Sequence, residues 1–217
     1  MVNPPPLTRG LYAITPDTAN TPGLLARVGA ALAGGATMVQ YRNKSAPAGL
    51  RREQASALVD LCLRHDVPLI VNDDAALALE VGAAGVHLGE GDGEIAHARR
   101  LLGSARRIGV SCYDRMELAM HADAAGADYV AFGSFFPSST KPAARKADAS
   151  LIRLAKRSLR VPVAAIGGIR ADNAGVLVDA GADWLCVISA LFDLSDEKAV
   201  RNSAREFAAL YARAEHA

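Results

Sequence analysis

Aromatic residues are scarce in this sequence, and long apolar runs and an excess of one charge are missing. Aromatic residues make up 5% of the 217 positions, so the hydrophobic fraction of 51% is mostly aliphatic and small side chains. No window approaches the roughly 18 to 20 uninterrupted apolar residues that a membrane-spanning helix needs. The formal net charge is +1, which gives no bulk attraction to nucleic acid. Composition therefore favours a globular protein with a sizeable core that binds neither membrane nor nucleic acid.

Cysteines are few, and the N-terminal segment carries no targeting pattern. Cys62, Cys112 and Cys186 are widely spaced, and no CxxC pair or Cys/His cluster suggests zinc. This pattern is typical of buried thiols in a reducing compartment. Residues 1–9 lack the basic-then-apolar order of a signal peptide, so we expect a short extended or disordered lead-in and a cytoplasmic protein. The length predicts a single domain, residues 1–217.

A weak internal repeat divides the chain into strand–helix units. Each copy places glycine and alanine directly before an apolar, strand-like segment, and its glycine suits the left-handed conformation that ends many helices. The copies recur roughly every 45 to 55 residues, about twice the length of one short unit, so they mark alternate strands. They begin at Gly34, Gly82, Ala125 and Ala180.

Apolar segments between these copies supply the remaining strands, and helical periodicity fills the gaps. The expected intervening strands span residues 11–14, 67–71, 107–110 and 161–166. Strands that alternate with helices predict a parallel sheet covered by helices. Eight such units favour an α/β fold, a single (β/α)8 TIM barrel with eight parallel strands inside a ring of helices. An open doubly wound sheet is the alternative, but it would concentrate its chemistry near one switch point.

Polar residues follow almost every expected strand directly. The carboxyl ends of the strands of such a barrel converge on one face, where these enzymes place their active sites. We therefore expect one pocket from segments that are far apart in the sequence. The segments are Gln40 to Lys44, Asn72-Asp73-Asp74, Asp92, Ser111, Ser138 to Lys141, Gly167-Gly168 and Ile188-Ser189.

The spacing Gln40-x-Arg42-x-Lys44 places three polar side chains on one side of a strand end. Arginine and lysine together offer bidentate and point-charge contacts to phosphate oxygens. A solvated loop with a pair of surface cations is the alternative. Further along the chain, the hydroxyls of residues 138–140, the glycine pair and Ser189 suit a small anion, because many barrels hold a phosphate in this region. For the 138–140 segment, the alternative is a flexible surface loop.

Two carboxylates on neighbouring loops, Asp73 and Asp92, suit Mg²⁺, which commonly takes one or two protein carboxylates. Asp74 is expected to cap the helix that follows it, and Asp92 has the alternative role of capping a helix over residues 95–102. His87 lies on an expected strand, where a packed, hydrogen-bonded histidine is favoured over a general base.

Taken together, these segments resemble the thiamine phosphate synthase family from about Leu11 to Ser189. The resemblance implies a transferase that couples 4-amino-2-methyl-5-hydroxymethylpyrimidine diphosphate to thiazole phosphate. Diphosphate leaves first in this Mg²⁺-assisted, dissociative reaction, so no strong base or covalent nucleophile is needed. Two positions depart from the family pattern: Glu90 stands for the usual glutamine and adds negative charge beside the metal loop, and Ser138 stands for threonine.

The resemblance also implies residue roles. Asp73 and Asp92 are the Mg²⁺ ligands, and Lys141, Ser111 and Arg42 are the catalytic residues. The pyrimidine diphosphate site comprises Gln40, Tyr41, Arg42, Asn43, Lys44, Asn72, Ser111 and Lys141. The thiazole phosphate site comprises Ser138, Ser139, Thr140, Gly167, Gly168, Ile188 and Ser189.

Three alternatives stay open at this point. The first is a thiazole tautomerase on the same barrel, and the second is a non-catalytic barrel that binds thiamine precursors. The third is a phosphate-binding barrel enzyme of another pathway. The expected partners are small molecules, and the sequence leaves room for a homo-oligomer without determining the oligomeric state.

Overall fold

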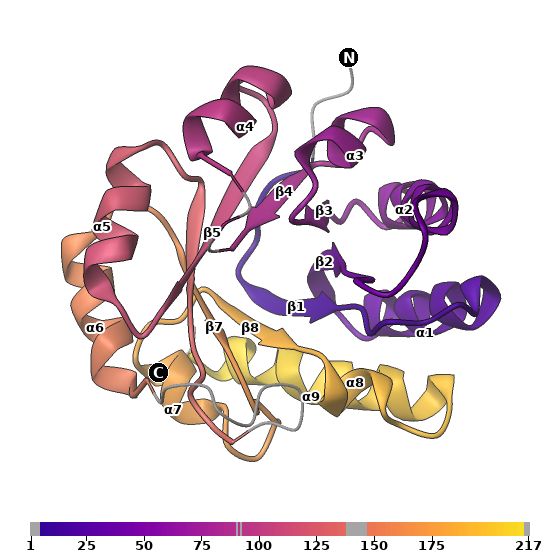
Figure 1. Cartoon of the computed structure of the whole chain (residues 1–217). Coiled ribbons are helices and arrows are strands. Elements are labelled where there is room, and N and C mark those ends of the chain that lie inside the picture. The colour runs from indigo at the N-terminus through magenta and orange to yellow at the C-terminus, as the bar shows by residue number, and fades with distance from the viewer. Residues whose placement is uncertain (1–4, 90, 92, 138–146, 215–217) are drawn as a thin grey trace.

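Eight parallel strands close into a barrel in chain order, and β8 pairs with β1 (Figure 1). The computed structural model describes residues 5–89, 91, 93–137 and 147–214. Closure confirms the predicted barrel and excludes the open sheet. The strands are β1 (Gly10–Ile14), β2 (Ala36–Tyr41), β3 (Leu69–Asn72), β4 (Gly85–Leu88), β5 (Arg107–Tyr113), β6 (Tyr129–Phe132), β7 (Val163–Ile166) and β8 (Trp184–Val187).

Helices surround the barrel and bury their apolar sides against it (Figure 1). The final helix packs against α1 and β1, with Val200, Phe207 and Tyr211 buried. None of the described helices has the length and hydropathy that crossing a membrane requires. The helices are α1 (Thr21–Ala33), α2 (Ala48–Leu63), α3 (Ala75–Glu80), α4 (Ile95–Leu102), α5 (Met116–Ala124), α6 (Ala149–Ser158), α7 (Gly175–Asp179), α8 (Ser189–Phe192) and α9 (Glu197–Ala214).

The internal repeat marks alternate strands, as predicted. One glycine in each copy has a positive φ just after a helix: 101° at Gly35, 72° at Gly82, 88° at Gly126 and 100° at Gly181. These glycines follow α1, α3, α5 and α7 and precede β2, β4, β6 and β8. Each turn reverses the chain within a few residues, and α1, α3 and α5 pack against the strands that follow them.

Two copies of the repeat end in an aspartate that joins neighbouring strands. Oδ2 of Asp128, before β6, accepts hydrogen bonds from the Ile108 amide at 2.8 Å and from Arg99 at 2.6 Å. Oδ2 of Asp183, before β8, accepts from the Val163 amide and the Lys156 ammonium, both at 2.7 Å. Each carboxylate therefore holds the beginning of one strand against the next at the end of the barrel opposite the predicted site.

The barrel has two cores, one between strands and helices and one inside the strands. Tyr12, Met38, Ile70, Tyr129 and Trp184 fill the interior and are at most 1% exposed. Side chains alternate along a strand, so Gln40 and Asn72 follow inward-facing positions by two residues and extend the interior towards the carboxyl ends. The indole of Trp184 donates to the Thr8 carbonyl at 2.7 Å, which ties the described part of the lead-in to the interior.

All three cysteines are buried and free, in agreement with the expected small buried thiols. Burial raises the pKa of the Cys62 and Cys112 thiols to about 12, so both are protonated and unreactive at neutral pH.

Candidate active site

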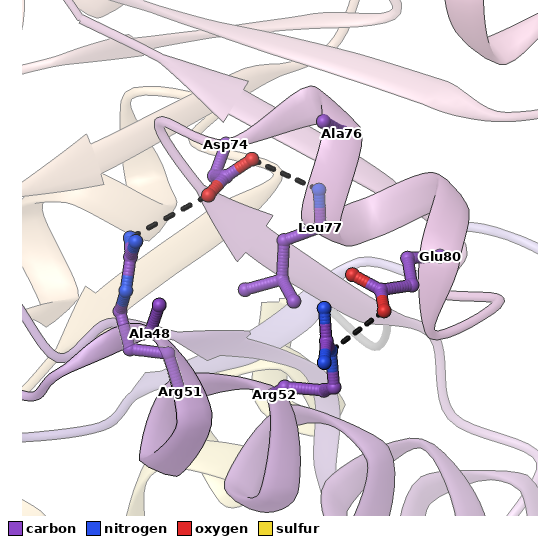
Figure 2. Close-up of a pocket in the computed structure, with 7 residues that line it drawn as sticks. All are labelled: Ala48, Arg51, Arg52, Asp74, Ala76, Leu77 and Glu80. Atoms are coloured by element: carbon purple, nitrogen blue, oxygen red, sulfur yellow. Dashed lines mark hydrogen bonds and ion pairs between the residues drawn. The ribbon is translucent and has the colours of Figure 1, made fainter.

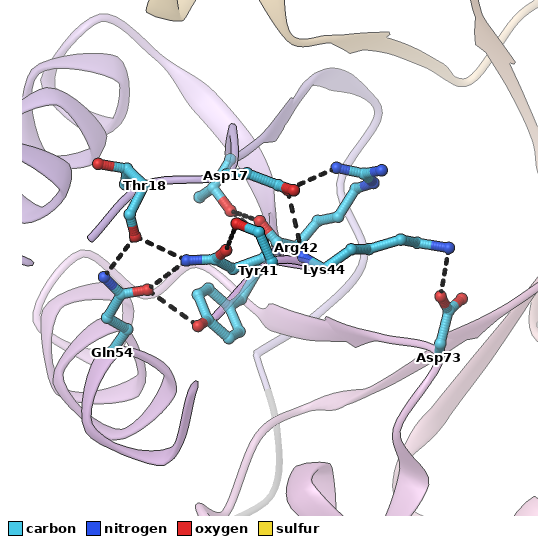
Figure 3. A network of polar contacts seen from close by, with 10 residues as sticks. Asp17, Thr18, Tyr41, Arg42, Lys44, Gln54 and Asp73 are labelled. Carbon is cyan, nitrogen blue, oxygen red and sulfur yellow. Dashed lines mark hydrogen bonds and ion pairs between the residues drawn. The ribbon is translucent and has the colours of Figure 1, made fainter. Parts of the chain in front are cut away.

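The predicted cations lie where β2 ends, and each has a carboxylate partner. Arg42 Nη1 lies 2.7 Å from Asp17 Oδ1, and Lys44 Nζ lies 2.9 Å from Asp73 Oδ2 (Figure 3). Gln40 is 3% exposed and donates from Nε2 to the Tyr12 hydroxyl at 2.9 Å. Gln40, Arg42 and Lys44 therefore have different partners from Tyr41 and Asn43, as expected if side chains alternate between two sides of the strand end. Two positive groups and one amide are therefore placed at the end of β2.

Tyr41 and Asn43 face the other way, towards α2. The Tyr41 hydroxyl donates to Gln54 Oε1 at 2.9 Å (Figure 3). Asn43 Nδ2 donates to the same oxygen at 3.0 Å. Gln54 Nε2 donates to the Thr18 carbonyl at 3.0 Å. Burial raises the pKa of Tyr41 to about 12, so its hydroxyl stays a donor. In this structure the Tyr41 hydroxyl and the Asn43 amide, both in predicted substrate-binding residues, hold the end of β2 against α2.

Gln54 has no place in the predicted site, although the structure makes it the centre of this network. It is fully buried, on the same face of α2 as Leu58 and Cys62. A polar side chain at a buried helical position needs hydrogen-bond partners. A glutamine at the same helical spacing as Leu58 and Cys62 was the signal in the sequence that could have indicated such a need, although it does not identify the partners.

The Asn72-Asp73-Asp74 segment divides its carboxylates between two roles. Asp73 has a φ of 64°, and its amide donates to the His87 carbonyl at 2.8 Å. Asp74 accepts from the Leu77 amide at 2.9 Å and caps α3, as predicted. Asp73 therefore turns away from α3 towards Lys44, while Asp74 belongs to the helix.

Two hollows adjoin this segment. The first lies between α2 and α3, where Arg51 lies 3.5 Å from Asp74 and Arg52 lies 2.6 Å from Glu80 (Figure 2). Its charges pair with one another. The second lies at the ends of β2 and β3 and brings several predicted site residues together. Its lining is Tyr41, Asn43, Lys44, Arg51, Val71, Asn72, Asp73 and Leu77.

His87 is a packed, hydrogen-bonded strand histidine, as predicted. Its Nδ1 lies 3.1 Å from the Tyr129 hydroxyl, and its Nε2 lies 2.9 Å from Ser111 Oγ. Burial lowers the pKa of His87 to about 4, although the Asp73 charge acts in the opposite direction. The imidazole is therefore neutral at neutral pH, and both its nitrogens are engaged with hydroxyls.

The glycine pair after β7 has the backbone conformation that suits close approach. Gly167 has a φ of 106° and Gly168 a φ of 62°. A Cβ on Gly168 would lie 2.2 Å from the Pro137 carbonyl, so the segments after β6 and β7 are in direct backbone contact. Ile188 and Ser189 follow β8, which pairs with β7. The described residues of the predicted thiazole phosphate site therefore come from adjacent strands.

Several predicted site residues lie outside the described part of the chain. They are Asp92, Ser138, Ser139, Thr140 and Lys141, together with the unusual Glu90. The helix that Asp92 was alternatively expected to cap is α4, which has Glu94 at its N-cap position.

The described residues permit a partial test of the Mg²⁺ prediction. Among them, no group of three or more His, Cys, Asp or Glu side chains is placed to hold a metal ion. Mg²⁺ commonly takes only one or two protein carboxylates, with water and substrate oxygens as its other ligands. Asp73 offers one partly exposed carboxylate beside a predicted phosphate-binding lysine, which fits one ligand of such an ion.

Comparisons with known proteins show the family of the chain. A family model described as thiamine monophosphate synthase matches residues 11–191. Thiamine-phosphate synthase of Thiobacillus denitrificans is 56% identical over 203 residues, 94% of this chain and 95% of that protein. The enzyme of the same name from Nitrosospira multiformis is 52% identical over 204 residues, 94% of this chain and 86% of that protein.

Solved structures that resemble this chain include proteins of the same kind. The thiamine phosphate pyrophosphorylase from Pyrococcus furiosus superimposes with a TM-score of 0.83 at 35% identity, covering 94% of this chain and 96% of that chain. A second pyrophosphorylase, from Bacteroides thetaiotaomicron, has a TM-score of 0.72 at 20% identity and supports the fold alone. The chain therefore belongs to the thiamine monophosphate synthase family of transferases.

Proposed function

We propose that this protein condenses 4-amino-2-methyl-5-hydroxymethylpyrimidine diphosphate with thiazole phosphate to give thiamine phosphate and diphosphate. One observation carries the proposal: Lys44, Asn72 and Asp73 line one hollow at the carboxyl ends of β2 and β3, in a chain whose relatives carry that enzyme's name. The carboxyl face is where barrel enzymes perform their chemistry.

The cations at the end of β2 would hold the diphosphate. Lys44 has a side chain that is 57% exposed, so its ion pair with Asp73 opens at little cost. Arg42 is held by Asp17 at 2.7 Å, which orients its guanidinium before a ligand arrives. In the proposed reaction the methylene–oxygen bond breaks as diphosphate leaves, and the thiazole nitrogen then bonds to the methylene. Preorganised positive charge favours the departure of that anion.

Gln40 and Asn72 would bind the aminopyrimidine and position its methylene, and Ser111 would bind either the pyrimidine or the leaving diphosphate. Gln40 and Ser111 lie on β2 and β5, on different sides of the barrel opening. His87 does not act as a base in this proposal, because burial lowers its pKa to about 4, which makes it a weak base, and both its nitrogens face hydroxyls. Holding the two substrates in contact supplies much of the remaining acceleration.

Asp73, together with Asp92, is proposed to hold Mg²⁺. The ion, when bound, would neutralise charge on the leaving diphosphate. Lys44 lies beside Asp73, so the lysine and the Mg²⁺ that Asp73 would hold would supply positive charge in the same region.

The thiazole phosphate is proposed to bind between the ends of β6, β7 and β8. Gly167 and Gly168 contribute a backbone without side chains, and Ile188 and Ser189 follow the neighbouring strand. Ser138, Ser139 and Thr140 are proposed to complete this site, with Lys141 as a further catalytic cation, on the basis of the sequence.

A coupling assay tests the proposal. Purified protein is mixed with both substrates and with Mg²⁺ or EDTA, and thiamine phosphate and diphosphate are quantified. Equal amounts of both products that depend on Mg²⁺ are expected. Folded protein that forms neither product would refute the synthase and favour the tautomerase or a binding role. A cytoplasmic location and a homo-oligomeric state belong to the same proposal and need separate measurement.

A further inference from the structure

A continuous row of hydrogen bonds crosses the interior of the barrel between two predicted substrate-binding residues. Gln40 Nε2 donates to the Tyr12 hydroxyl at 2.9 Å, and the Tyr12 and Tyr129 hydroxyls lie 2.8 Å apart. Tyr129 lies 3.1 Å from His87 Nδ1, and His87 Nε2 lies 2.9 Å from Ser111 Oγ. The row therefore connects β2 with β5 through groups that are not themselves predicted to touch a substrate.

Each hydroxyl in this row has one proton to donate, and this determines which group donates in each hydrogen bond. The Tyr12 oxygen accepts from Gln40, so its single proton has only the Tyr129 oxygen to go to. The Tyr129 proton then goes to His87 Nδ1. Burial keeps the pKa of both phenols far above the neutral range, so each retains its proton. A neutral imidazole that accepts at Nδ1 carries its proton on Nε2 and donates it to Ser111.

Close packing holds the central members in place. Tyr12 and Tyr129 are 0% exposed, and the Tyr129 ring packs edge-on against Trp184 at a centroid distance of 5.6 Å. A Cβ on Gly109 would lie 2.0 Å from the Tyr129 ring, so the missing side chain on β5 makes the space that this ring fills. The phenol cannot turn away from His87 without disturbing the core.

We propose that His87 is a positioning residue whose Nε2–H, set by Tyr129 and Tyr12, makes Ser111 a hydrogen-bond donor to the bound substrate. Since the Ser111 oxygen accepts from His87, the serine proton points away from the row and towards the site. This inference rests on the proposed function, because it assumes that Ser111 contacts substrate. It defines the partner as an acceptor, either a pyrimidine ring nitrogen or a diphosphate oxygen.

The other end of the row has the opposite polarity. Gln40 uses its amide nitrogen on Tyr12, so the amide oxygen is the group left to accept from a ligand. The site therefore offers an acceptor on β2 and a donor on β5. An aminopyrimidine carries the complementary pair, an exocyclic amino donor and a ring-nitrogen acceptor.

The direction of these hydrogen bonds can be measured by NMR, without an assay of enzymatic activity. The nitrogen chemical shifts of ¹⁵N-histidine-labelled, ligand-free protein report which nitrogen of each imidazole carries the proton, and the His87→Gln variant identifies the His87 signals. A single tautomer protonated at Nε2 is expected, and Tyr129→Phe should mix the two tautomers. A His87 proton on Nδ1 in the unsubstituted protein would overturn the proposal.

Kinetics then test whether the row acts through Ser111. Tyr129→Phe should lower kcat about tenfold, the size of one net hydrogen bond. Added to Ser111→Ala, it should cause no further loss, because a residue that acts only through Ser111 has nothing left to position. His87→Gln, which keeps a donor towards Ser111, should retain more activity than His87→Leu. Losses that multiply in the double variant would overturn the positioning role.

Tyr211→Phe is the matched control, since it removes the hydroxyl of a tyrosine that is 5% exposed on α9, beside Arg9 and away from the row. It should leave kcat and the His87 tautomer unchanged. A loss equal to that of Tyr129→Phe would mean that any buried hydroxyl matters, which contradicts the proposal. Absence of thiamine phosphate with the unsubstituted protein would instead refute the proposed function, while the tautomer measurement would still stand.

Discussion

The ammonium of Lys44 lies 2.9 Å from Oδ2 of Asp73, so an ion pair joins the ends of β2 and β3. The two side chains are 57% and 26% exposed, and an exposed pair contributes less than about 1 kcal/mol to stability. Its importance is chemical, because it places a predicted phosphate-binding cation beside a predicted metal ligand.

Asp73→Asn should lower turnover without destabilising the fold. Asparagine tolerates the left-handed conformation at this position, where φ is 64°, so the free energy of unfolding should change by less than about 1 kcal/mol. Turnover should fall by about 10² to 10³, as for the loss of a charge-stabilising group. Asp66→Asn is the control, an exposed aspartate with a φ of 54°. Near-normal turnover of Asp73→Asn at limiting Mg²⁺ would remove the ligand role.

Gly168→Ala should raise the KM for thiazole phosphate and lower stability by about 1–3 kcal/mol. The added Cβ would lie 2.2 Å from the Pro137 carbonyl, so the segment after β6 must shift. Gly103→Ala is a matched control, with a φ of 73° and open space around the added atom. It also places a side chain at positive φ and should leave KM unchanged. Equal KM values for the two variants, measured by substrate titration, would locate the phosphate elsewhere.

Asp183→Ala should weaken the barrel without affecting its chemistry. The carboxylate accepts from the Val163 amide and Lys156, both at 2.7 Å, and the substitution leaves that strand amide without its partner. The free energy of unfolding in urea should fall by about 1–3 kcal/mol, with kcat unchanged. Asp172→Ala breaks the exposed pair with Arg170 and should cost far less. A comparable loss in both variants would contradict the strand-joining role.

His87 should make stability depend on pH in a defined window. Its pKa is lowered from 6.5 to about 4, so between these values the unfolded chain binds more protons than the folded protein. Stability therefore rises with pH: the contribution of His87 is complete above pH 6.5 and is lost as pH falls towards 4. The full effect is on the order of 3 kcal/mol.

Urea unfolding in EDTA across this window measures the slope. His87→Gln should flatten it, whereas His121→Gln, at an exposed position on α5, should not. An unchanged slope in His87→Gln would show that His87 is not the group responsible.

Local features of the sequence predicted most of the fold. Glycine before each alternate strand, apolar strand segments and helical periodicity act over a few residues, so the eight strands could be located from them. Strand ends were less predictable: β5 extends to Tyr113, three residues beyond the expected end at 110, because pairing with β6 continues there. The role of Asp74 as a helix cap is equally local, and the structure confirms it.

The sequence by itself determined the barrel, the family and the face on which polar residues gather, since all three follow from short-range patterns and ordered motifs. Only the tertiary structure decided which polar atoms meet. Gln54 joins Tyr41 and Asn43, and Tyr12 and Tyr129, 117 positions apart, share a hydrogen bond inside the barrel. Such contacts depend on barrel closure and side-chain packing across strands, which no local spacing encodes. The direction of the hydrogen-bond row that ends at Ser111 is therefore a property of the closed barrel.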